Sequence, residues 1–349
     1  MKKSYPTEPL AHWLGTVFAA LGVERALADR SARAIVRTNA RGIDTHGVAR
    51  VLIYVDKLMA GELNPAAEVR FEDRNGILHV HADGALGQGA GLMAVDAAAA
   101  RARETGAVVA ILHDVGHLGA LGLYVLEAAD QGMLAFMVQS TPPVMALPGS
   151  RGAAIGNNPI AFASPVDGGA PLVFDMATSG VARGNVVMAA RAGRAIPEGW
   201  AIDAEGNPTT DAQAALRGAM LPVAGHKGIG LAMLVECFAG SLSGAKPPPM
   251  AATGGSAPSR VGAFLMLVNP ALAAGPGAYG AHLTEWMETY KAASGDQGRY
   301  PGERAFGLEA ERGRTGIPLP PETVADLVRA GEKAGVPFDV APLKGERVP

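Results

Sequence analysis

Segments with strand patterns and segments with helix patterns alternate between residues 77 and 139, and this alternation constrains the fold most. Residues 77–81 alternate apolar and polar side chains as a strand does, and 107–112 and 134–139 are short apolar runs. Residues 88–104 and 118–131, which separate them, have helical spacing. Strands joined by helices predict an α/β fold, and the less regular alternation up to Asn269 predicts a mixed sheet.

Both ends of the chain have helical patterns. Apolar residues recur at helical spacing from about residue 7 to residue 40, a further helix is expected over 45–60, and a final one over 321–335. Two segments rich in Pro, Gly or Ser, at 246–259 and 294–298, predict loops.

Charge and cysteine content exclude several classes of protein. The 349 residues carry a net charge of −3 with no basic stripe, which disfavours nucleic-acid binding. The single cysteine, Cys237, excludes an intrachain disulfide and a cysteine-based metal cluster, and no other metal set is recognisable. The longest apolar stretch, 229–238, is too short to span a membrane, and no apolar run follows the charged N-terminus. We therefore expect a cytoplasmic protein without a metal.

His46, in the run Arg41-Gly42-Ile43-Asp44-Thr45-His46-Gly47-Val48-Ala49-Arg50, is the strongest catalytic candidate. Imidazole titrates near neutral pH and can give or take a proton. Arg50 lies four residues on, so a helix that begins at Asp44 or Thr45 would place both side chains on one face. A proton donor beside a guanidinium suits a carboxylate next to a carbonyl or hydroxyl group, although such a pair also occurs as a purely structural one.

A glycine-rich run after the first strand imitates a dinucleotide-binding turn. Gly87-Gln88-Gly89-Ala90-Gly91 opens a helix but misses the Gly-x-Gly-x-x-Gly spacing, which disfavours a Rossmann site. His117, in the run 114–120, is expected to open a helix after an apolar strand, where α/β proteins contact ligands; a structural role is equally open.

Three further segments have both a structural and a binding interpretation. The amides of Asn157 and Asn158 fix a tight turn or face a polar ligand. Asp175 ends an apolar strand and accepts ribose hydroxyls, orients a histidine, or caps the next helix. His226 and Lys227, within a glycine-rich helix start, suit a phosphate.

These segments together resemble the malate/L-lactate dehydrogenase family of NAD(P)-dependent oxidoreductases, which is distinct from the Rossmann-type lactate and malate dehydrogenases. The matching motifs run in order along residues 8–335: Asp44-Thr45-His46-Gly47 with Arg50, Gly116-His117-Leu118-Gly119, Gly156-Asn157-Asn158-Pro159, Phe174-Asp175-Met176-Ala177-Thr178-Ser179, Ile196-Pro197-Glu198-Gly199-Trp200 with Pro208-Thr209-Thr210-Asp211, Gly225-His226-Lys227-Gly228 and Pro301-Gly302-Glu303-Arg304. Seven modest motifs in the right order make a specific match.

The resemblance implies a non-Rossmann, mixed-sheet nucleotide-binding domain, helices from both chain ends that pack together, and a homodimer. We accordingly expect an N-terminal helical domain over 1–66, an NAD(P)-binding α/β domain over 67–310, and a C-terminal helical segment over 311–349 that packs on the first domain.

The resemblance also implies roles for single residues. His46 would exchange a proton with the substrate oxygen, with Thr45, where the family usually has serine, as a relay. Arg50 would hold the substrate carboxylate, and Asn157 and Asn158 would contact the substrate. The NAD or NADP site would comprise His117, Leu118, Gly119, Ala120, Leu121, Asp175, Met176, Ala177, His226, Lys227, Gly302, Glu303 and Arg304.

The expected reaction is hydride transfer between nicotinamide and a small 2-oxo or 2-hydroxy acid of the malate, lactate or sulfolactate type. The alternative is a cyclic-imine reductase acting on piperideine- or pyrroline-2-carboxylate. Such reductases tend to carry His-Gly-Asp where this chain has Arg183-Gly184-Asn185, and an amide cannot carry the charge of that aspartate. The sequence therefore favours the hydroxy acid.

Overall fold

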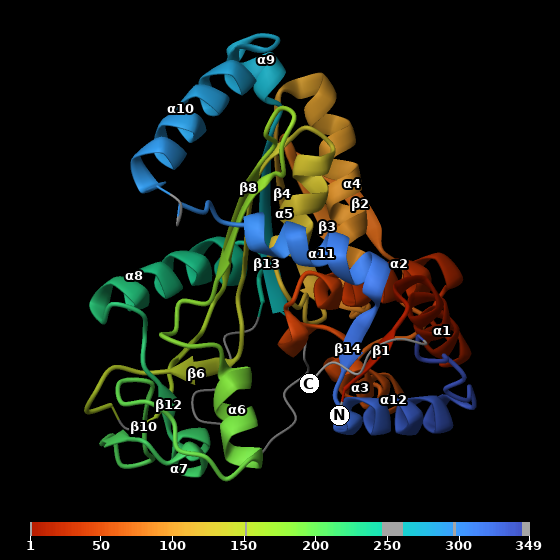
Figure 1. Cartoon of the computed structure of the whole chain (residues 1–349). Helices are drawn as coiled ribbons and strands as arrows, with labels where there is room; N and C mark the ends of the chain where they lie inside the picture. The colour runs from red at the N-terminus through yellow and green to blue at the C-terminus, as the bar shows by residue number, and fades with distance from the viewer. Residues whose placement is uncertain (1, 151, 246–260, 296–297, 344–349) are drawn as a thin grey trace.

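The computed structural model describes residues 2–150, 152–245, 261–295 and 298–343 (Figure 1). Its centre is a seven-stranded sheet in which only the β3–β4 pair is parallel. The strand order is β2 (Arg70–Arg74), β3 (Ile77–His81), β4 (Ala107–Val115), β13 (Val261–Val268), β5 (Leu134–Gln139), β8 (Ile160–Ser164) and β9 (Leu172–Met176). This confirms the predicted α/β fold with a mixed sheet.

Two helices cover one face of this sheet, α4 (Gly87–Thr105) and α5 (Gly122–Asp130) (Figure 1). A Cβ atom at Gly87 would lie 2.4 Å from the Gly116 carbonyl oxygen, and one at Gly91 would lie 2.5 Å from the Tyr124 ring. The glycines of the near-match to a dinucleotide turn therefore let α4 pack closely against its protein neighbours, which explains them without a phosphate.

The other face of the sheet carries α8 (His226–Val235) and the π-helix η3 (Glu236–Ser241), whose Ala239 packs with Phe264 of β13. A projecting arm follows β13 and consists of α9 (Pro270–Ala274) and α10 (Ala278–Ser294) (Figure 1). The predicted loop 246–259 lies outside the described residues.

A second, five-stranded sheet stands below the first one in Figure 1. Its order is β11 (Pro208–Thr209), β10 (Ala201–Ile202), β12 (Ala219–Met220), β6 (Pro143–Met145) and β7 (Ile155–Gly156). It packs with α6 (Arg183–Arg191) and α7 (Ala212–Arg217) around a separate small core that contains Val186, Ile196 and Ala201. Helix α6 therefore packs in this small core and not in the core of the large sheet.

Segments from both ends of the chain lie side by side (Figure 1). Strand β1 (Lys3–Tyr5) pairs antiparallel with β14 (Ile317–Leu319), and the final helix α12 (Pro321–Ala334) packs on α1 (Thr7–Ala20) and α3 (Val51–Met59). Between them α2 (Arg25–Ala40) contacts α11 (Glu303–Thr315). The division into three domains stays a prediction, and its boundary at residue 310 falls inside α11.

Two predicted helix starts are wrong. The helix expected over 45–60 is divided into two short 3₁₀ turns, η1 (Asp44–His46) and η2 (Val48–Arg50), and α3 begins only at Val51. The helix expected from Leu118 begins at Gly122, so His117 lies in a loop and not at a helix start. In both places side-chain hydrogen bonds to the backbone compete with the helix.

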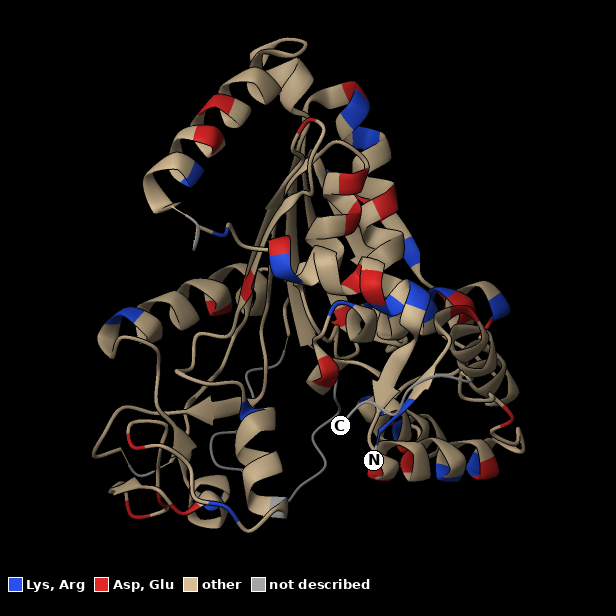
Figure 2. Cartoon of the chain, in the orientation of Figure 1, with Lys and Arg blue, Asp and Glu red and all other residues tan. Residues whose placement is uncertain are grey.

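Acidic and basic residues are interspersed over the helices that Figure 2 shows. In the described part of the chain, no helix combines the length and the apolar character that a membrane span needs.

Candidate functional site

Asn39 and Arg312 hold the turn that carries His46. The buried amide of Asn39, near the end of α2, donates to Asp44 Oδ1 at 2.8 Å and accepts from the Val48 amide at 2.9 Å. Arg312 of α11 donates to the same Asp44 oxygen at 2.9 Å. A Cβ atom at Gly47 would lie 2.3 Å from Asn39 Oδ1, so only glycine fits there. The turn is thereby fixed between α2 and α11.

His46 and Arg50 are neighbours in space although no single helix carries both. Arg50 Nε donates to the Thr45 carbonyl at 3.0 Å, and Thr45 Oγ1 lies 3.1 Å from His46 Nδ1. Burial, and then the charge of Arg50, lower the pKa of His46 to about 4. The imidazole is therefore neutral near pH 7 in the free protein and able to accept a proton.

Arg183 is the first residue of α6, whose first turn contacts the His46 turn. A Cβ atom at Gly184 would lie 3.3 Å from Thr45 Cγ2, which brings the first turn of α6 against the His46 turn. The pKa of Arg183 is lowered by burial and by the charge of Arg50. The two positive charges are therefore close enough to influence each other.

A second histidine stands beside the first. The rings of His46 and His117 have their centroids 5.7 Å apart and stack at 28°. His117 Nδ1 lies 2.9 Å from the hydroxyl of Tyr54, and Gln88 donates to the His117 carbonyl at 3.0 Å. Burial lowers the pKa of His117 well below its usual value and raises that of Tyr54 to about 12, so both side chains are neutral.

Neither Tyr54 nor Gln88 was predicted from the sequence to belong to the site. The spacing from Arg50 to Tyr54 is one helical turn, and that spacing was the available signal for Tyr54. A phenol that donates to Nδ1 leaves the other ring nitrogen of His117 as a donor.

The loop after His117 leads from His46 to Asp175. The Gly122 amide donates to Asp175 Oδ2 at 2.8 Å, and the His46 carbonyl lies 3.9 Å from the Cβ position of Gly119. Solvent reaches the Asp175 carboxylate, while the protein packed around it raises its pKa to about 6. Leu118, Ala120 and Leu121 are buried, so they support this loop from beneath.

Two helix starts with basic residues flank strand β9. Helix α8 begins at His226 and Lys227, and α11 begins at Glu303 and Arg304; no side chain of the described residues caps either helix. The turn before α11 is fixed to β9 by a hydrogen bond from the Val173 amide to the Pro301 carbonyl, at 2.9 Å. Uncapped N–H groups and a nearby cation together suit phosphate oxygens.

Met176 is the last residue of β9, and Ala177 follows it. Both are partly exposed and lie between Asp175 and the start of α8. The Cβ position of Gly228 lies 2.9 Å from the Thr178 carbonyl, so the end of β9 meets α8 directly. Glu303 accepts from Lys291 at 3.1 Å through one oxygen, while its other carboxylate oxygen is buried and has no hydrogen-bond partner among the described residues. Glycine backbone, uncapped amides and a solvent-reachable carboxylate fit a dinucleotide.

The two asparagines differ in exposure. Asn158 is fully buried; its Nδ2 donates to the Ala232 carbonyl at 2.9 Å and lies 3.3 Å from Glu236. Asn157 is partly exposed and accepts from Thr141 Oγ1 at 3.1 Å. Asn158 therefore fixes α8, and Asn157 is the one with an amide still open to a ligand.

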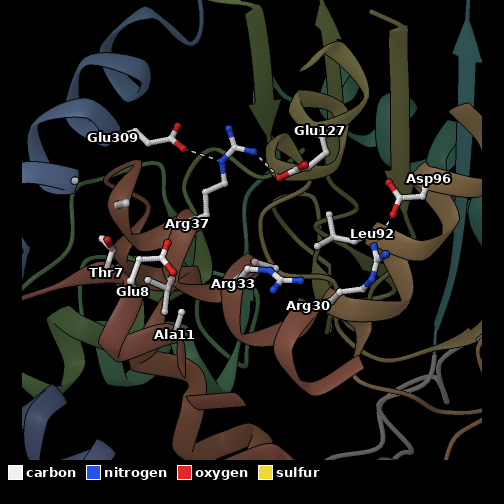
Figure 3. Close-up of a pocket in the computed structure, with 14 residues that line it drawn as sticks. Thr7, Glu8, Ala11, Arg30, Arg33, Arg37, Leu92, Asp96, Glu127 and Glu309 are labelled. Atoms are coloured by element: carbon white, nitrogen blue, oxygen red, sulfur yellow. Dashed lines mark hydrogen bonds and ion pairs between the residues drawn. The ribbon is translucent and has the colours of Figure 1, made fainter. Parts of the chain in front are cut away.

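A pocket of about 490 Å³ lies away from these residues, among α1, α2, α4, α5 and α11 (Figure 3). Arg37 crosses it and pairs with Glu127 and with Glu309, and Arg30 pairs with Asp96. None of the predicted site residues lines this pocket. Its paired charges hold the helices together, so we do not assign the site there.

Within the described ranges, no group of three or more His, Cys, Asp or Glu side chains is arranged to hold a metal ion. Three histidines instead stack on one another, His79 and His81 of β3 and His113 of β4. His79 is hydrogen-bonded to His113, His113 to the Ser243 carbonyl, and His81 lies beside Glu72.

Comparison with known proteins agrees with this geometry. The family model described as malate/L-lactate dehydrogenase matches residues 5–328. A (2R)-3-sulfolactate dehydrogenase (NADP(+)) of Chromohalobacter salexigens is 36% identical over 315 residues, which cover 89% of this chain and 92% of that protein. A Delta(1)-pyrroline-2-carboxylate reductase of Pseudomonas fluorescens is 36% identical over 312 residues, or 86% and 92% of the two chains.

Among solved structures, the delta1-piperideine-2-carboxylate reductase from Pseudomonas syringae pvar. tomato aligns with a TM-score of 0.86 at 30% identity. The alignment covers 95% of this chain and 99% of that one. The fold thus carries both dehydrogenases and reductases, and the residues of the site must separate the two activities.

Proposed function

The chain belongs to the malate/L-lactate dehydrogenase family and is an NAD(P)-dependent 2-hydroxy acid dehydrogenase, and we propose that His46 exchanges the proton with its substrate. The observation that carries this proposal is the pairing of a neutral, partly exposed imidazole with the guanidinium of Arg50. In the described part of the chain, Arg50 forms no ion pair with a carboxylate, and its side chain donates a hydrogen bond to the Thr45 carbonyl. It is therefore ready to bind a carboxylate from outside.

The proton step follows from these charges. In the oxidation of a hydroxy acid, neutral His46 accepts the hydroxyl proton; in reduction, protonated His46 returns it to the carbonyl oxygen. A substrate carboxylate bound at Arg50 offsets the positive charge that lowers the pKa of His46, so protonation becomes easier when substrate is present. Thr45 holds the ring through Nδ1 and can relay the proton.

The nicotinamide, when bound, supplies or accepts the hydride. We propose that the uncapped starts of α8 and α11, with Lys227 and Arg304, bind its phosphates, and that Asp175 accepts a ribose hydroxyl. His117, oriented by Tyr54, would present a ring N–H group beside His46. We retain Asn157 as a substrate contact and assign to Asn158 the positioning of α8.

The pH dependence of the two directions tests the assignment of His46. Because the pKa of free His46 is lowered to about 4, kcat/KM for oxidation should stay constant from about pH 7 down to about pH 5 and fall only near pH 4. For reduction, kcat/KM should rise about tenfold per unit as pH falls over the same range.

Initial rates in both directions, with activity re-measured at pH 7 after each acid exposure, provide the measurement and its control. An inflection in the oxidative profile near pH 6.5, where an unperturbed histidine titrates, would contradict the assignment.

A second candidate activity is cyclic-imine reduction, which relatives at 36% identity carry in their names. Asn185, in the first turn of α6, cannot supply the carboxylate that the resemblance assigns to such reductases. Assays with 2-oxo acids and with piperideine-2-carboxylate, each with NADH and NADPH, separate the two activities. Faster turnover of the imine would favour the second candidate.

We further propose a homodimer, as the resemblance implies, in the cytoplasm, as the sequence led us to expect. Large apolar side chains are exposed along α8 and η3 and on α10: Leu231, Met233, Leu234, Phe238, Trp286 and Tyr290. A second copy would remove this surface from water. Light scattering of the purified protein should give the mass of two 35.6 kDa chains, and a mass of one chain at micromolar concentration would contradict the dimer.

A further inference from the structure

We propose that Arg183 is a specificity residue that, together with Arg50, selects a 2-hydroxy acid with a second anionic group, a carboxylate or a sulfonate. This inference rests on the proposed function, because it extends the substrate position defined by His46 and Arg50. It narrows the substrate class from small hydroxy acids in general to dianionic ones.

The position of α6 is the first observation. Its first turn contacts the His46 turn through Gly184, whose Cβ position lies 3.3 Å from Thr45 Cγ2, although the two segments are separated by about 140 residues in sequence. Arg183 immediately precedes that glycine and is exposed to solvent. The backbone of Arg183 therefore lies close to the turn of His46, the proposed proton-transfer residue, and Arg50, the proposed ligand of the first carboxylate.

The missing counter-charge is the second observation. Arg37, Arg41 and Arg312 each pair with at least one carboxylate of the chain. Arg183 and Arg50 do not, within the part of the chain that the structure describes. The two charges interact: the protein packed around Arg183, and then the charge of Arg50, lower the pKa of Arg183. Two like charges that the protein leaves unbalanced favour a ligand that brings two negative charges.

The surroundings of the pair support an anion. No side chain caps the start of α6, so its first N–H groups point to the same end of the helix as Arg183. Asn185 in that turn is neutral and does not repel an anion. A monocarboxylate would balance only Arg50 and leave Arg183 unpaired.

The same charges disfavour the cyclic imines. A protonated imine has a positive ring nitrogen next to its single carboxylate, and two guanidinium groups that pair with no carboxylate of the described residues would repel that nitrogen. The pair therefore separates dianionic hydroxy acids from imines on electrostatic grounds alone.

The test compares substrates with one and two anionic groups. We expect the wild-type protein to reduce oxaloacetate or 3-sulfopyruvate with a higher kcat/KM than pyruvate. Arg183→Gln should lower kcat/KM for the two dianions about 10- to 100-fold, the range for a lost hydrogen bond to a charged group, and change that for pyruvate less than about threefold. Arg183→Lys should restore part of the loss, because it returns the charge without the planar fork.

Arg217→Gln provides the matched control, since Arg217 is exposed on neighbouring α7 and has no ion pair among the described residues. The melting temperature of each variant verifies folding. Equal losses for pyruvate and the dianions, a wild-type preference for pyruvate, or a raised KM for the cofactor without a substrate effect would each overturn the proposal. If the wild-type protein reduces no 2-oxo acid, the proposed function itself fails, which is a distinct outcome.

Discussion

The variant His46→Ala is expected to lose about 10²- to 10⁴-fold in kcat and to bind NADH or NADPH as the wild type does. The loss follows because no other group would supply the proton as charge develops on the substrate oxygen. His117 is the nearest alternative, but its ring is held by Tyr54 and burial keeps it neutral. Steady-state assays with the preferred 2-oxo acid, and titration of NADH fluorescence, measure the two quantities.

His12→Ala is the matched control, because His12 is exposed on α1 and its side chain has no described partner. It should leave both quantities unchanged. Full turnover by the His46 variant would remove this residue from the mechanism and would favour His117 as the acid.

The variant Arg50→Lys is expected to raise KM for the acid about 10- to 100-fold with a smaller effect on kcat. Lysine keeps the positive charge but loses the two parallel N–H groups that bind a carboxylate in a bidentate manner. It also loses the Nε donor to the Thr45 carbonyl, so some loss of kcat is expected as well. Substrate saturation curves at a saturating cofactor concentration separate the two effects.

Arg50→Gln sharpens this experiment because it removes the charge. The pKa of His46 should then rise toward its usual value, and the acid limb of the oxidative pH profile should move upward in pH. If KM is unchanged in both variants, another group holds the substrate carboxylate.

The sequence predicted the regular elements of the sheet well, because period and length alone determine them. The strands at 77–81 and 134–139 and the helix α4 lie where their patterns placed them. The His46 turn was not predictable in this way. Its conformation depends on Asn39 and on Arg312, which contact it from α2 and from α11, 268 positions away from Asp44.

The contents of the site were predictable only in part. Motif order along the chain indicated His46, Arg50, His117 and Asp175, and contacts in the structure connect their segments. The position of Arg183 relative to Arg50 depends on how the small second core places α6. No local sequence pattern predicts that placement. Asn158 was predicted to contact the substrate, but it is buried and its amide donates to the Ala232 carbonyl of α8.

The most direct measurement is an experimental structure of this protein with a reduced nicotinamide and oxalate, an unreactive analogue of the substrate. We expect the imidazole of His46 to lie within about 3.2 Å of an oxalate oxygen, the Arg50 guanidinium to bind the adjacent carboxylate, and the nicotinamide ring to stack beside them. Oxalate and nicotinamide bound together at a place that His46 does not reach, in any subunit of the assembly, would contradict this expectation.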